Sequence, residues 1–295
     1  MTQTSNHYTF GENDLAAQRL AYLAAAYERP SREFLSAWGI ENAEHAIDLG
    51  CGPGYTSLLL WHVLSPRLVT GIDASDKLLS HARLRAPFIT FLRHDVTRAP
   101  FPCAAADVLF CRFLLTHLHE PAMAVRAWSV AAKPGARLLI QETATLDSDE
   151  PVIRRYYELL AALQSGYGQA LHVGADLDGC IGHDGWAILS SELVVVEQDA
   201  SVMARLHAMN IRTWSQDAMA QRSFDSREIA DVQSGLEGIA TGKQTAARSV
   251  RNTLAPVSRG QDVVPQTLQD STSALDRGII GLTANQVDSR KAGSF

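Results

Sequence analysis

The chain has 295 residues, of which 46% are hydrophobic and 20% charged, so it can bury a substantial core and is not expected to be disordered as a whole. Its 26 Lys and Arg against 32 Asp and Glu give a formal charge of −6, and no basic run is long enough to follow a phosphate backbone, so we expect no nucleic-acid partner. No apolar run approaches the ~18 residues that a membrane-spanning helix needs, and the first residues lack the features of a signal peptide. We therefore expect a cytoplasmic protein without membrane contact.

The cysteines are too widely spaced for a CxxC metal or redox pair. A chain of this length also needs no disulfide to fold. We expect free thiols and no metal site. The four residues are Cys51, Cys103, Cys111 and Cys180.

The N-terminal part, residues 1–44, is predicted to form a helical cap. Apolar residues return at helical spacing across 13–28, and Pro30 is expected to stop that helix. A second short helix is predicted over 31–38, because a Gly follows it in the way that commonly ends a helix.

From residue 45 to 145, short apolar runs alternate with amphipathic stretches, which is typical of a parallel sheet covered by helices. The sequence therefore predicts an open α/β sheet. The predicted strands are 45–50, 67–73, 88–95, 107–113 and 137–143, and the predicted helices are 55–64, 75–86 and 120–133, the last ended by Pro134-Gly135.

Residues 146–258 are predicted to form a substrate cover together with the last strands of the same sheet. The segment 166–185 is rich in glycine without a clear period, which favours a loop. The weakly periodic residues 259–295 predict a mobile tail or one short helix. The other predicted elements are a helix over 150–165, a strand over 191–200, mostly helix over 201–241 and a last strand over 246–257.

A glycine-rich turn joins the first predicted strand to the first helix of the sheet. Gly50, Gly52 and Gly54 lack a Cβ, so the backbone can bend sharply there and approach a ligand closely. Asp73 closes the second strand, where an acid can accept both hydroxyls of a ribose. Together they indicate an adenosine-like ligand across the carboxyl edge of the sheet. The GxGxG spacing differs from the GxGxxG of dinucleotide sites.

The segment DLGCGPG at residues 48–54 resembles motif I of the class I S-adenosylmethionine-dependent methyltransferases. The resemblance extends through most of residues 45–145, with RHDVTRAPFP, DVLFCRFLLTHL and KPGARLLIQE matching in the right order. It implies a Rossmann-like, mostly parallel seven-stranded sheet with helices on both faces, an N-terminal helical cap and helical insertions. It also implies S-adenosylmethionine as cofactor and S-adenosylhomocysteine as product.

The family's cofactor contacts carry over to matching positions of this chain. The resemblance implies that Asp73 binds the ribose, Asp95 lies near the adenine amino group and Asp48 lies beneath the methionine amino group. Asp95 can equally be an acid of a turn, and Tyr22 or Tyr27 can either touch the methionine carboxylate or only pack. The implied cofactor contacts are Asp48, Gly50, Cys51, Gly52, Gly54, Asp73, Ala74, Asp95 and Val96, with Cys111, Arg112 and Tyr22 as further candidates.

The candidates for a catalytic base follow the fourth strand. His117 is the first choice and His119 the second, because both come after that strand at the ligand edge, although either can instead cap or pack the next helix. His172 and His183 are lesser candidates in the glycine-rich segment. A carboxylate or tertiary-amine acceptor would need no base.

The predicted function is methyl transfer from S-adenosylmethionine to an O, N, S or C atom of a small molecule, with a specialised metabolite as the expected substrate class. The cover offers aromatic surface for such a molecule, although each ring is as readily part of the core. One alternative is a cofactor-binding protein of the same fold without methyl transfer, such as a cyclase or a structural partner. A nicotinamide-dependent oxidoreductase is disfavoured by the glycine spacing and by the lack of a Tyr-x-x-x-Lys pair. A homo-oligomer is compatible with the sequence. The aromatic residues are Tyr156, Tyr157, Tyr167, Trp186 and Trp214.

Overall fold

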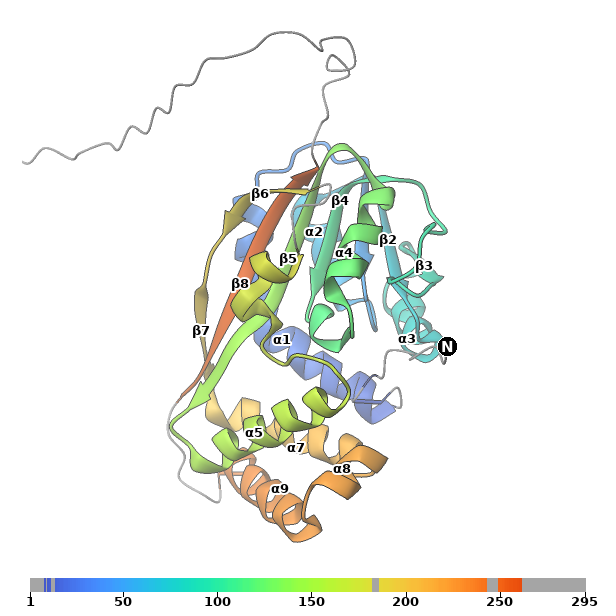
Figure 1. Ribbon diagram of the computed structural model, residues 1–295. Helices are drawn as coiled ribbons and strands as arrows, with labels where there is room; N and C mark the ends of the chain where they lie inside the picture. Colours follow the sequence, from blue (N-terminus) through green and yellow to red (C-terminus); the bar gives the residue numbers. More distant parts are fainter. Residues whose placement is uncertain (1–7, 9, 12–13, 182–185, 243–248, 262–295) are drawn as a thin grey trace, which may run out of the picture. The chain divides into compact units, whose positions relative to one another are not determined.

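The computed structural model describes residues 8, 10–11, 14–181, 186–242 and 249–261, which lie in one compact unit formed by residues 1–262 (Figure 1). His183 and residues 262–295 of the predicted tail lie outside the described residues. Within the described ranges, no helix combines the length and the apolar character needed to cross a membrane.

The described strands form one sheet in the order β3-β2-β1-β4-β5-β8-β6, and β7 also pairs with β8. β1 to β5 pair in parallel, whereas β8 runs antiparallel to its neighbours. β6 and β7 pair with successive parts of β8 and share one edge position, so the sheet has seven positions among the described residues. The predicted mostly parallel seven-stranded sheet is confirmed. The strands are β1 (His45–Leu49), β2 (Leu68–Asp73), β3 (Thr90–Arg93), β4 (Ala106–Arg112), β5 (Ala132–Ser148), β6 (Trp186–Ser191), β7 (Val194–Asp199) and β8 (Ser249–Gln261).

Helices cover both faces of the sheet because alternate residues of the central strands point to opposite sides. On one face, Ala46 of β1 packs with residues of α1 (Asp14–Ala37) and α2 (Tyr55–Leu64). On the other face, Ile47 and Leu49 pack with α4 (Pro121–Trp128). The helix α3 (Asp76–Arg85) packs beside β2 and β3, and Ser75 caps it by accepting a hydrogen bond from the Leu78 N–H.

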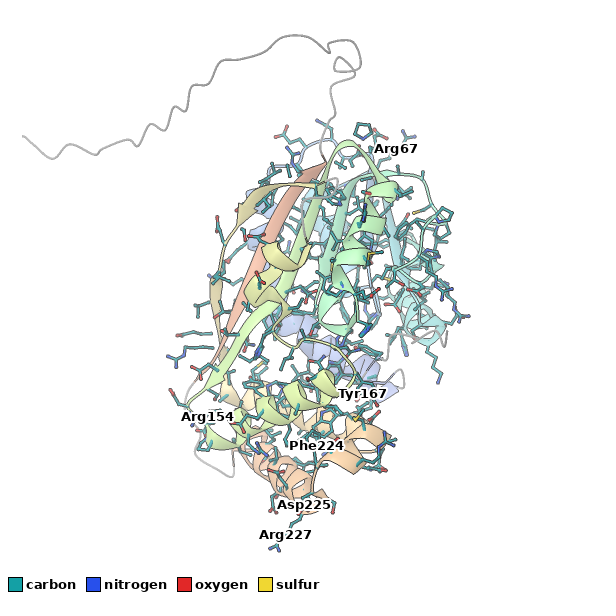
Figure 2. The ribbon with its side chains drawn as sticks, in the orientation of Figure 1. Arg67, Arg154, Tyr167, Phe224, Asp225 and Arg227 are labelled. Atoms are coloured by element: carbon teal, nitrogen blue, oxygen red, sulfur yellow. The ribbon has the colours of Figure 1, made fainter. Side chains whose placement is uncertain are left out.

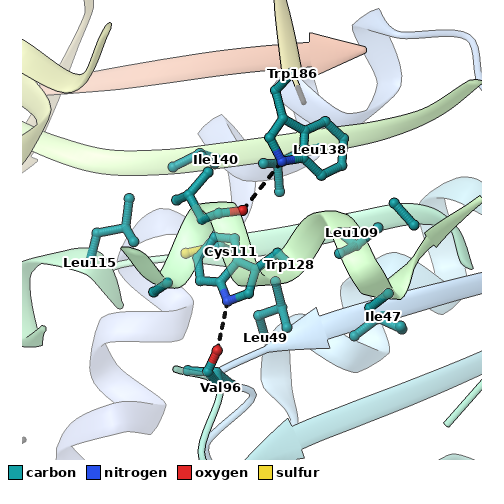
Figure 3. Packing of buried hydrophobic residues seen from close by; sticks show 14 of the residues in the cluster. Ile47, Leu49, Val96, Leu109, Cys111, Leu115, Trp128, Leu138, Ile140 and Trp186 are labelled. Carbon is teal, nitrogen blue, oxygen red and sulfur yellow. Dashed lines mark hydrogen bonds between the residues drawn. The ribbon is translucent and has the colours of Figure 1, made fainter. Parts of the chain in front are cut away.

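Two tryptophans anchor the face covered by α4 (Figure 3). Trp128 is fully buried, and its indole N–H donates to the Val96 carbonyl at 2.9 Å. Trp186 is also buried, and its indole N–H donates to the Val125 carbonyl at 3.3 Å. These hydrogen bonds tie the turn after β3 and the edge strand β6 to the same helix.

A second core joins the helices beyond the carboxyl ends of the strands, seen at the lower end of the view in Figure 1. In Figure 2, Tyr167, Phe224 and Asp225 mark this helical cover, and the Tyr167 hydroxyl donates to the Asp217 carboxylate at 2.7 Å. β5 leads directly into the cover, since only two residues separate its end from the start of α5. The cover consists of α5 (Pro151–Gly166), α7 (Ala200–Trp214), α8 (Ala218–Ser223) and α9 (Ser226–Ala240), and α1 packs against α7.

Pro30 does not stop the first helix, which is a correction to the sequence prediction: α1 runs unbroken to Ala37. A proline in a helix removes one backbone donor, and tertiary contacts can outweigh that loss. Here the second half of α1 buries Leu35 completely, and the Ser31 hydroxyl donates to Gln141 at 2.5 Å. These contacts with the sheet hold the helix together beyond the proline.

Pro134 and Gly135 also do not end a helix: α4 ends at Trp128 and a short 3₁₀ turn (Ser129–Ala131) leads into β5. The pairing of β4 with β5 jumps from Ala132 to Arg137, so this dipeptide lies in an irregular part of the strand. The predicted loop 166–185 is likewise wrong in part. It contains a 3₁₀ turn (Val173–Asp176) and α6 (Leu177–Ile181), and β6 follows at Trp186.

The short elements of that segment were missed because tertiary burial, and not local periodicity, stabilises them. Val173, Leu177 and Trp186 are buried in the core shared with α4. Each element contributes only one or two such residues, so none forms a readable stripe along the sequence.

Replacing Trp128 by Phe tests the contact between α4 and the turn after β3. Trp128→Phe leaves the Val96 carbonyl without its donor and removes part of a buried ring, so the free energy of unfolding should fall by about 1–3 kcal/mol. Urea denaturation followed by circular dichroism measures this change. Trp61→Phe is the control, because Trp61 is only half-buried and its ring meets the exposed Phe88 ring at a tilt. Equal losses in the two variants would contradict the assignment.

Candidate functional site

A cavity extends from the glycine turn at the carboxyl edge of the sheet to α1, α5 and α7. It therefore joins the predicted cofactor edge to the helical cover. Of the predicted site residues, those that line it are Gly50, Cys51, Gly52, Asp73, Ala74, Asp95, Val96, Arg112 and His117. Those that do not are Asp48, Gly54, Cys111, Tyr22 and His119.

The three glycines of the turn have positive φ angles but different surroundings. A Cβ on Gly50 would lie 2.7 Å from the Leu114 side chain, so that position has no room for one. A Cβ on Gly54 would lie 3.0 Å from Ala82 and from Phe91, which makes Gly54 a packing position at the start of α2. At Gly52 the nearest atom, on the Leu20 side chain, would be 3.8 Å away, which is an ordinary contact distance. Gly52 lines the cavity and is the least crowded of the three glycines.

Asp73 fixes the shape of this turn. One carboxylate oxygen accepts the Gly52 N–H at 2.8 Å, and the other accepts the Ser75 N–H at 2.8 Å. The carboxylate therefore links the glycine turn to the start of α3. A carboxylate has about four lone-pair sites, so it retains capacity for further donors from the cavity.

Asp95 lies in a turn that also borders the cavity. Its carboxylate accepts the Thr97 N–H at 3.0 Å and the Thr97 hydroxyl at 2.7 Å, and it pairs with Arg98 at 3.2 Å. The two sequence interpretations of Asp95, a turn acid and a residue of the ligand edge, thus describe the same position.

Asp48 lies behind the turn, buried beneath α2. Its carboxylate accepts hydrogen bonds from the Thr56 and Ser57 hydroxyls at 2.6 Å. Burial raises the pKa of Asp48 to about 6, and these two hydrogen bonds and the charge of Arg112 oppose that rise. A positive charge near this carboxylate would favour its ionised form.

Arg112 joins the end of β4 to α1, since its guanidinium donates to the Ser31 hydroxyl at 2.9 Å. Burial lowers the pKa of Arg112 to about 10, while the charge of Asp48 opposes that change. Of the two tyrosines proposed on α1, Tyr22 is 38% exposed and lies outside the cavity, whereas Tyr27 lines it and receives a hydrogen bond from Asn252.

The two cysteines proposed as contacts are both buried, and burial raises the pKa of each thiol. Cys51 lines the cavity at the glycine turn. Cys111 lies inside β4, with its sulfur 3.8 Å from a carboxylate oxygen of Glu142.

His117 ends a 3₁₀ turn (Leu115–His117) after β4 and lines the cavity. Its ring meets Tyr8 and Phe10 edge-on, at centroid distances of 4.9 and 5.6 Å. Burial, aided by the charge of Arg19, lowers the pKa of His117 to about 3, so the ring is neutral at physiological pH. A histidine with this pKa is a weak base, but it can still donate or accept one hydrogen bond.

The other predicted histidines lie elsewhere. His119 is exposed, and its Nδ1 lies 3.3 Å from the Gly168 carbonyl oxygen. His172 is exposed at the start of the 3₁₀ turn Val173–Asp176 and does not line the cavity.

Glu142 on β5 supports the turn that carries His117, and the sequence analysis missed it. One carboxylate oxygen accepts the N–H groups of Leu114 and Leu115, each at 2.7 Å. Burial raises the pKa of Glu142 to about 7, although these hydrogen bonds oppose the rise. The available signal was an acid near the carboxyl end of a predicted central strand, the edge at which ligands bind.

A group of polar side chains on the helical cover was also missed. Arg19 of α1 is only 3% exposed, and it donates to the Tyr8 hydroxyl at 2.5 Å and lies over the Phe10 ring. On α7, Asn210 donates to the Tyr156 hydroxyl at 2.6 Å, and His207 is hydrogen-bonded to the Tyr157 hydroxyl at 3.0 Å. In the sequence, Arg19 lies one helical turn from apolar residues that recur across 13–28. A charged side chain is unexpected at such a position, and this could have identified Arg19.

Five aromatic side chains were proposed as substrate surface. Tyr156 lines the cavity, and Tyr157 is buried beside His207. Trp186 and Trp214 are fully packed in the two cores, so their rings face protein on all sides. Tyr167 does not line the cavity.

Comparison with known proteins agrees with this geometry. Residues 47–140 match a family model described as a methyltransferase domain. The trans-aconitate 2-methyltransferase of Paracidovorax citrulli is 36% identical over 114 residues, which are 38% of this chain and 44% of that protein. The enzyme of the same name from Escherichia fergusonii is 37% identical over 99 residues, 34% of this chain and 39% of that protein.

The chain thus matches less than half of the length of each of these relatives. Among solved structures, the YcgJ protein of Bacillus subtilis aligns with a TM-score of 0.50 at 15% identity, covering 79% of this chain and 98% of that one. At this identity the likeness shows the fold alone.

The residues that match this family model supply only one side of the cavity. The glycine turn, Asp73 and His117 lie within the matched residues 47–140, whereas Arg19 and the helices α5 and α7 lie outside them. In the described part of the chain, no group of three or more His, Cys, Asp or Glu side chains is arranged to hold a metal ion.

Removing the carboxyl group of Glu142 should change how stability depends on pH. Because its folded-state pKa is raised from 4.5 to about 7, the folded protein keeps this proton longer than the unfolded chain does, so its contribution to the free energy of unfolding falls as pH rises between those values. The fall amounts to about 3 kcal/mol. Glu142→Gln should not show this fall in the free energy of unfolding. Buried histidines make the free energy of unfolding change with pH in the opposite direction, but they do so equally in both proteins, so their effect cancels in the comparison. Urea denaturation of both proteins from pH 4.5 to 8 measures the difference, and parallel curves would contradict the prediction.

Proposed function

We propose that this chain binds S-adenosylmethionine at the glycine turn and transfers its methyl group to a small molecule held under the helical cover. The observation that carries the proposal is the single cavity that runs from Gly52 and Asp73 to side chains of α1, α5 and α7. A cofactor at one end of this cavity and an acceptor at the other would meet inside it. The relatives named trans-aconitate 2-methyltransferases support methyl transfer as the reaction.

The residues at the turn fit this cofactor. Gly52 is the least crowded glycine of the turn and lines the cavity, and the Asp73 carboxylate borders the same cavity, where it would accept ribose hydroxyls. Asp95 and Val96 border the cavity where an adenine would lie. Arg112 lines the cavity and suits the carboxylate of the methionine part, while Asp48, buried behind the turn, acts on this end of the cavity through its charge.

When bound, the cofactor supplies a methyl group on a positively charged sulfur, which a nucleophile can accept in one in-line displacement. The chain's own contribution is then to position the acceptor and exclude water, which can account for ~7 to 11 kcal/mol of the barrier. The apolar side chains of the cover exclude water. His117 is neutral, so in this proposal it orients the acceptor by a hydrogen bond and does not serve as a strong base.

Calorimetry with S-adenosylmethionine and with NAD tests the proposed cofactor, and mass spectrometry of small molecules that copurify with the protein supplies acceptor candidates. Binding of S-adenosylmethionine but not NAD, followed by stoichiometric formation of S-adenosylhomocysteine with an acceptor, is the expected result. Turnover of an acceptor with the cofactor intact would instead indicate the fold without methyl transfer.

Asp73→Asn should weaken S-adenosylmethionine binding by about 1–3 kcal/mol. The amide replaces one of the two acceptor oxygens with an NH₂ group, which cannot accept a ribose hydroxyl. Asp76→Asn is the matched control three residues away, since Asp76 is exposed at the start of α3 and pairs with Arg93. Titration calorimetry of both variants at pH 7 measures the change. Unchanged affinity in Asp73→Asn would remove Asp73 from the site.

A further inference from the structure

Arg19 is a buried cation without a carboxylate partner among the described residues. Its side chain lines the cavity, its only described hydrogen bond goes to the neutral Tyr8 hydroxyl, and its Nε is buried without a partner. A guanidinium removed from water is costly unless an opposite charge accompanies it. The described protein provides no such charge, so an anion that enters the cavity would meet the need.

The second cation of the described cavity residues is already engaged. Arg112 lies beside the Asp48 carboxylate and donates to the Ser31 hydroxyl. The methionine part of the cofactor was assigned to that pair above. Arg19, in contrast, lies among Tyr8, Phe10 and His117, on the side of the helical cover.

Other polar atoms around this part of the cavity also have no hydrogen-bond partner. The side-chain oxygen of Gln164, the oxygen of Asn210 and the Nδ1 of His207 are all buried without a hydrogen-bond partner, and all three residues line the cavity. Buried polar groups in native proteins are nearly always paired, so unpaired ones that border one cavity indicate a missing ligand. The two amide oxygens can only accept hydrogen bonds, so a donor on the body of the ligand, such as a hydroxyl group, would pair them, and a carboxylate would not.

The rest of the cover side of the cavity is apolar. Apart from the groups already named, the walls contributed by α1, α5 and α7 are mainly hydrocarbon, so they suit a hydrocarbon body rather than several charges. The residues are Leu20, Leu23, Ala24, Leu160, Met203 and Leu206.

Resting on the function proposed above, we propose that the substrate is a monocarboxylic acid with a hydrocarbon body, whose carboxylate binds Arg19. Arg19 is then the residue that determines substrate class. The geometry of guanidinium and carboxylate allows two parallel hydrogen bonds, one of them from the unpaired Nε. The proposal differs from the tricarboxylate in the name of the relatives, since the cover side offers one free guanidinium among the described residues.

The histidines of the cavity agree with an anionic ligand. Burial, aided at His117 by the charge of Arg19, lowers the pKa of His117 and of His207 to about 3, so both side chains stay neutral and add no second positive charge to the cavity. A carboxylic acid is also already ionised at pH 7, so it needs no base to accept the methyl group.

The test measures the binding of matched acids and amides to the full chain saturated with S-adenosylhomocysteine. The ligands for titration calorimetry are octanoate, octanamide, cinnamate, cinnamamide and trans-aconitate. They vary the charge of the head group and the shape of the hydrocarbon part separately. At least one of the two monocarboxylates should bind at least 10-fold more tightly than its amide and than trans-aconitate. Equal binding of acid and amide, or tighter binding of trans-aconitate, would overturn the proposal.

The variant Arg19→Met should weaken binding of the monocarboxylate by about 10- to 100-fold, as expected for the loss of a charge-assisted hydrogen-bonding partner, and Arg19→Lys should restore part of it. The thermal midpoint of Arg19→Met should be at least as high as that of the wild type, because an unpaired buried charge is removed. Arg29→Gln is the control on the same helix, since Arg29 is exposed and pairs with Glu33. Unchanged acid binding in Arg19→Met, or a lowered midpoint with unchanged binding, would contradict the role of Arg19.

S-adenosylmethionine binding separates the two proposals. If Arg19→Met binds the cofactor as the wild type does but has lost the acid, both proposals stand. If Arg19→Met loses the cofactor instead, Arg19 belongs to the methionine part and the substrate proposal fails while the proposed function stands. If the wild-type protein does not bind the cofactor, the proposed function fails first.

Discussion

The Asp73 carboxylate links the two turns on which the site depends. By accepting N–H groups from Gly52 and from Ser75, it fixes the backbone after β1 relative to the backbone after β2. The parallel register of β1 and β2 places both turns at the same edge of the sheet, so one acid can reach both. The glycine turn owes its shape to this hydrogen bonding as much as to the absence of side chains. Any ligand that Asp73 holds is therefore held by an acid whose position the sheet already determines.

Much of this arrangement could be predicted from the sequence because it follows from local patterns. The alternation of apolar runs predicted the parallel strands, and the GxGxG segment predicted the turn. The family resemblance implied which acidic residues lie at the carboxyl edge of the sheet, and Asp73 and Asp95 do border the cavity there. These residues lie within a few positions of strand ends, where spacing along the chain and position in space are closely coupled.

The cover could not be predicted in the same way, because its side chains meet through tertiary contacts. Arg19 and His117 are separated by nearly a hundred residues, and nothing local indicates that they share a cavity. Pro30 and Pro134 misled the prediction of helix ends, since burial of Leu35 and the irregular pairing of β5 decide those boundaries. Glu142 was overlooked because a single acid in a strand carries no spacing signal. Its role depends on the turn after β4, which folds back onto it.

The divided edge strand has a consequence for the behaviour of the molecule at high concentration. β6 and β7 pair with successive parts of β8, but Glu192 and Leu193 separate the two strands, and Leu193 is 66% exposed. An uninterrupted apolar edge would offer a long row of free backbone groups on which another chain could stack, the first step toward fibrous aggregates. The break limits any added strand to a short stretch on either side. In this way the chain keeps valine-rich residues at its edge while reducing the risk of forming such aggregates.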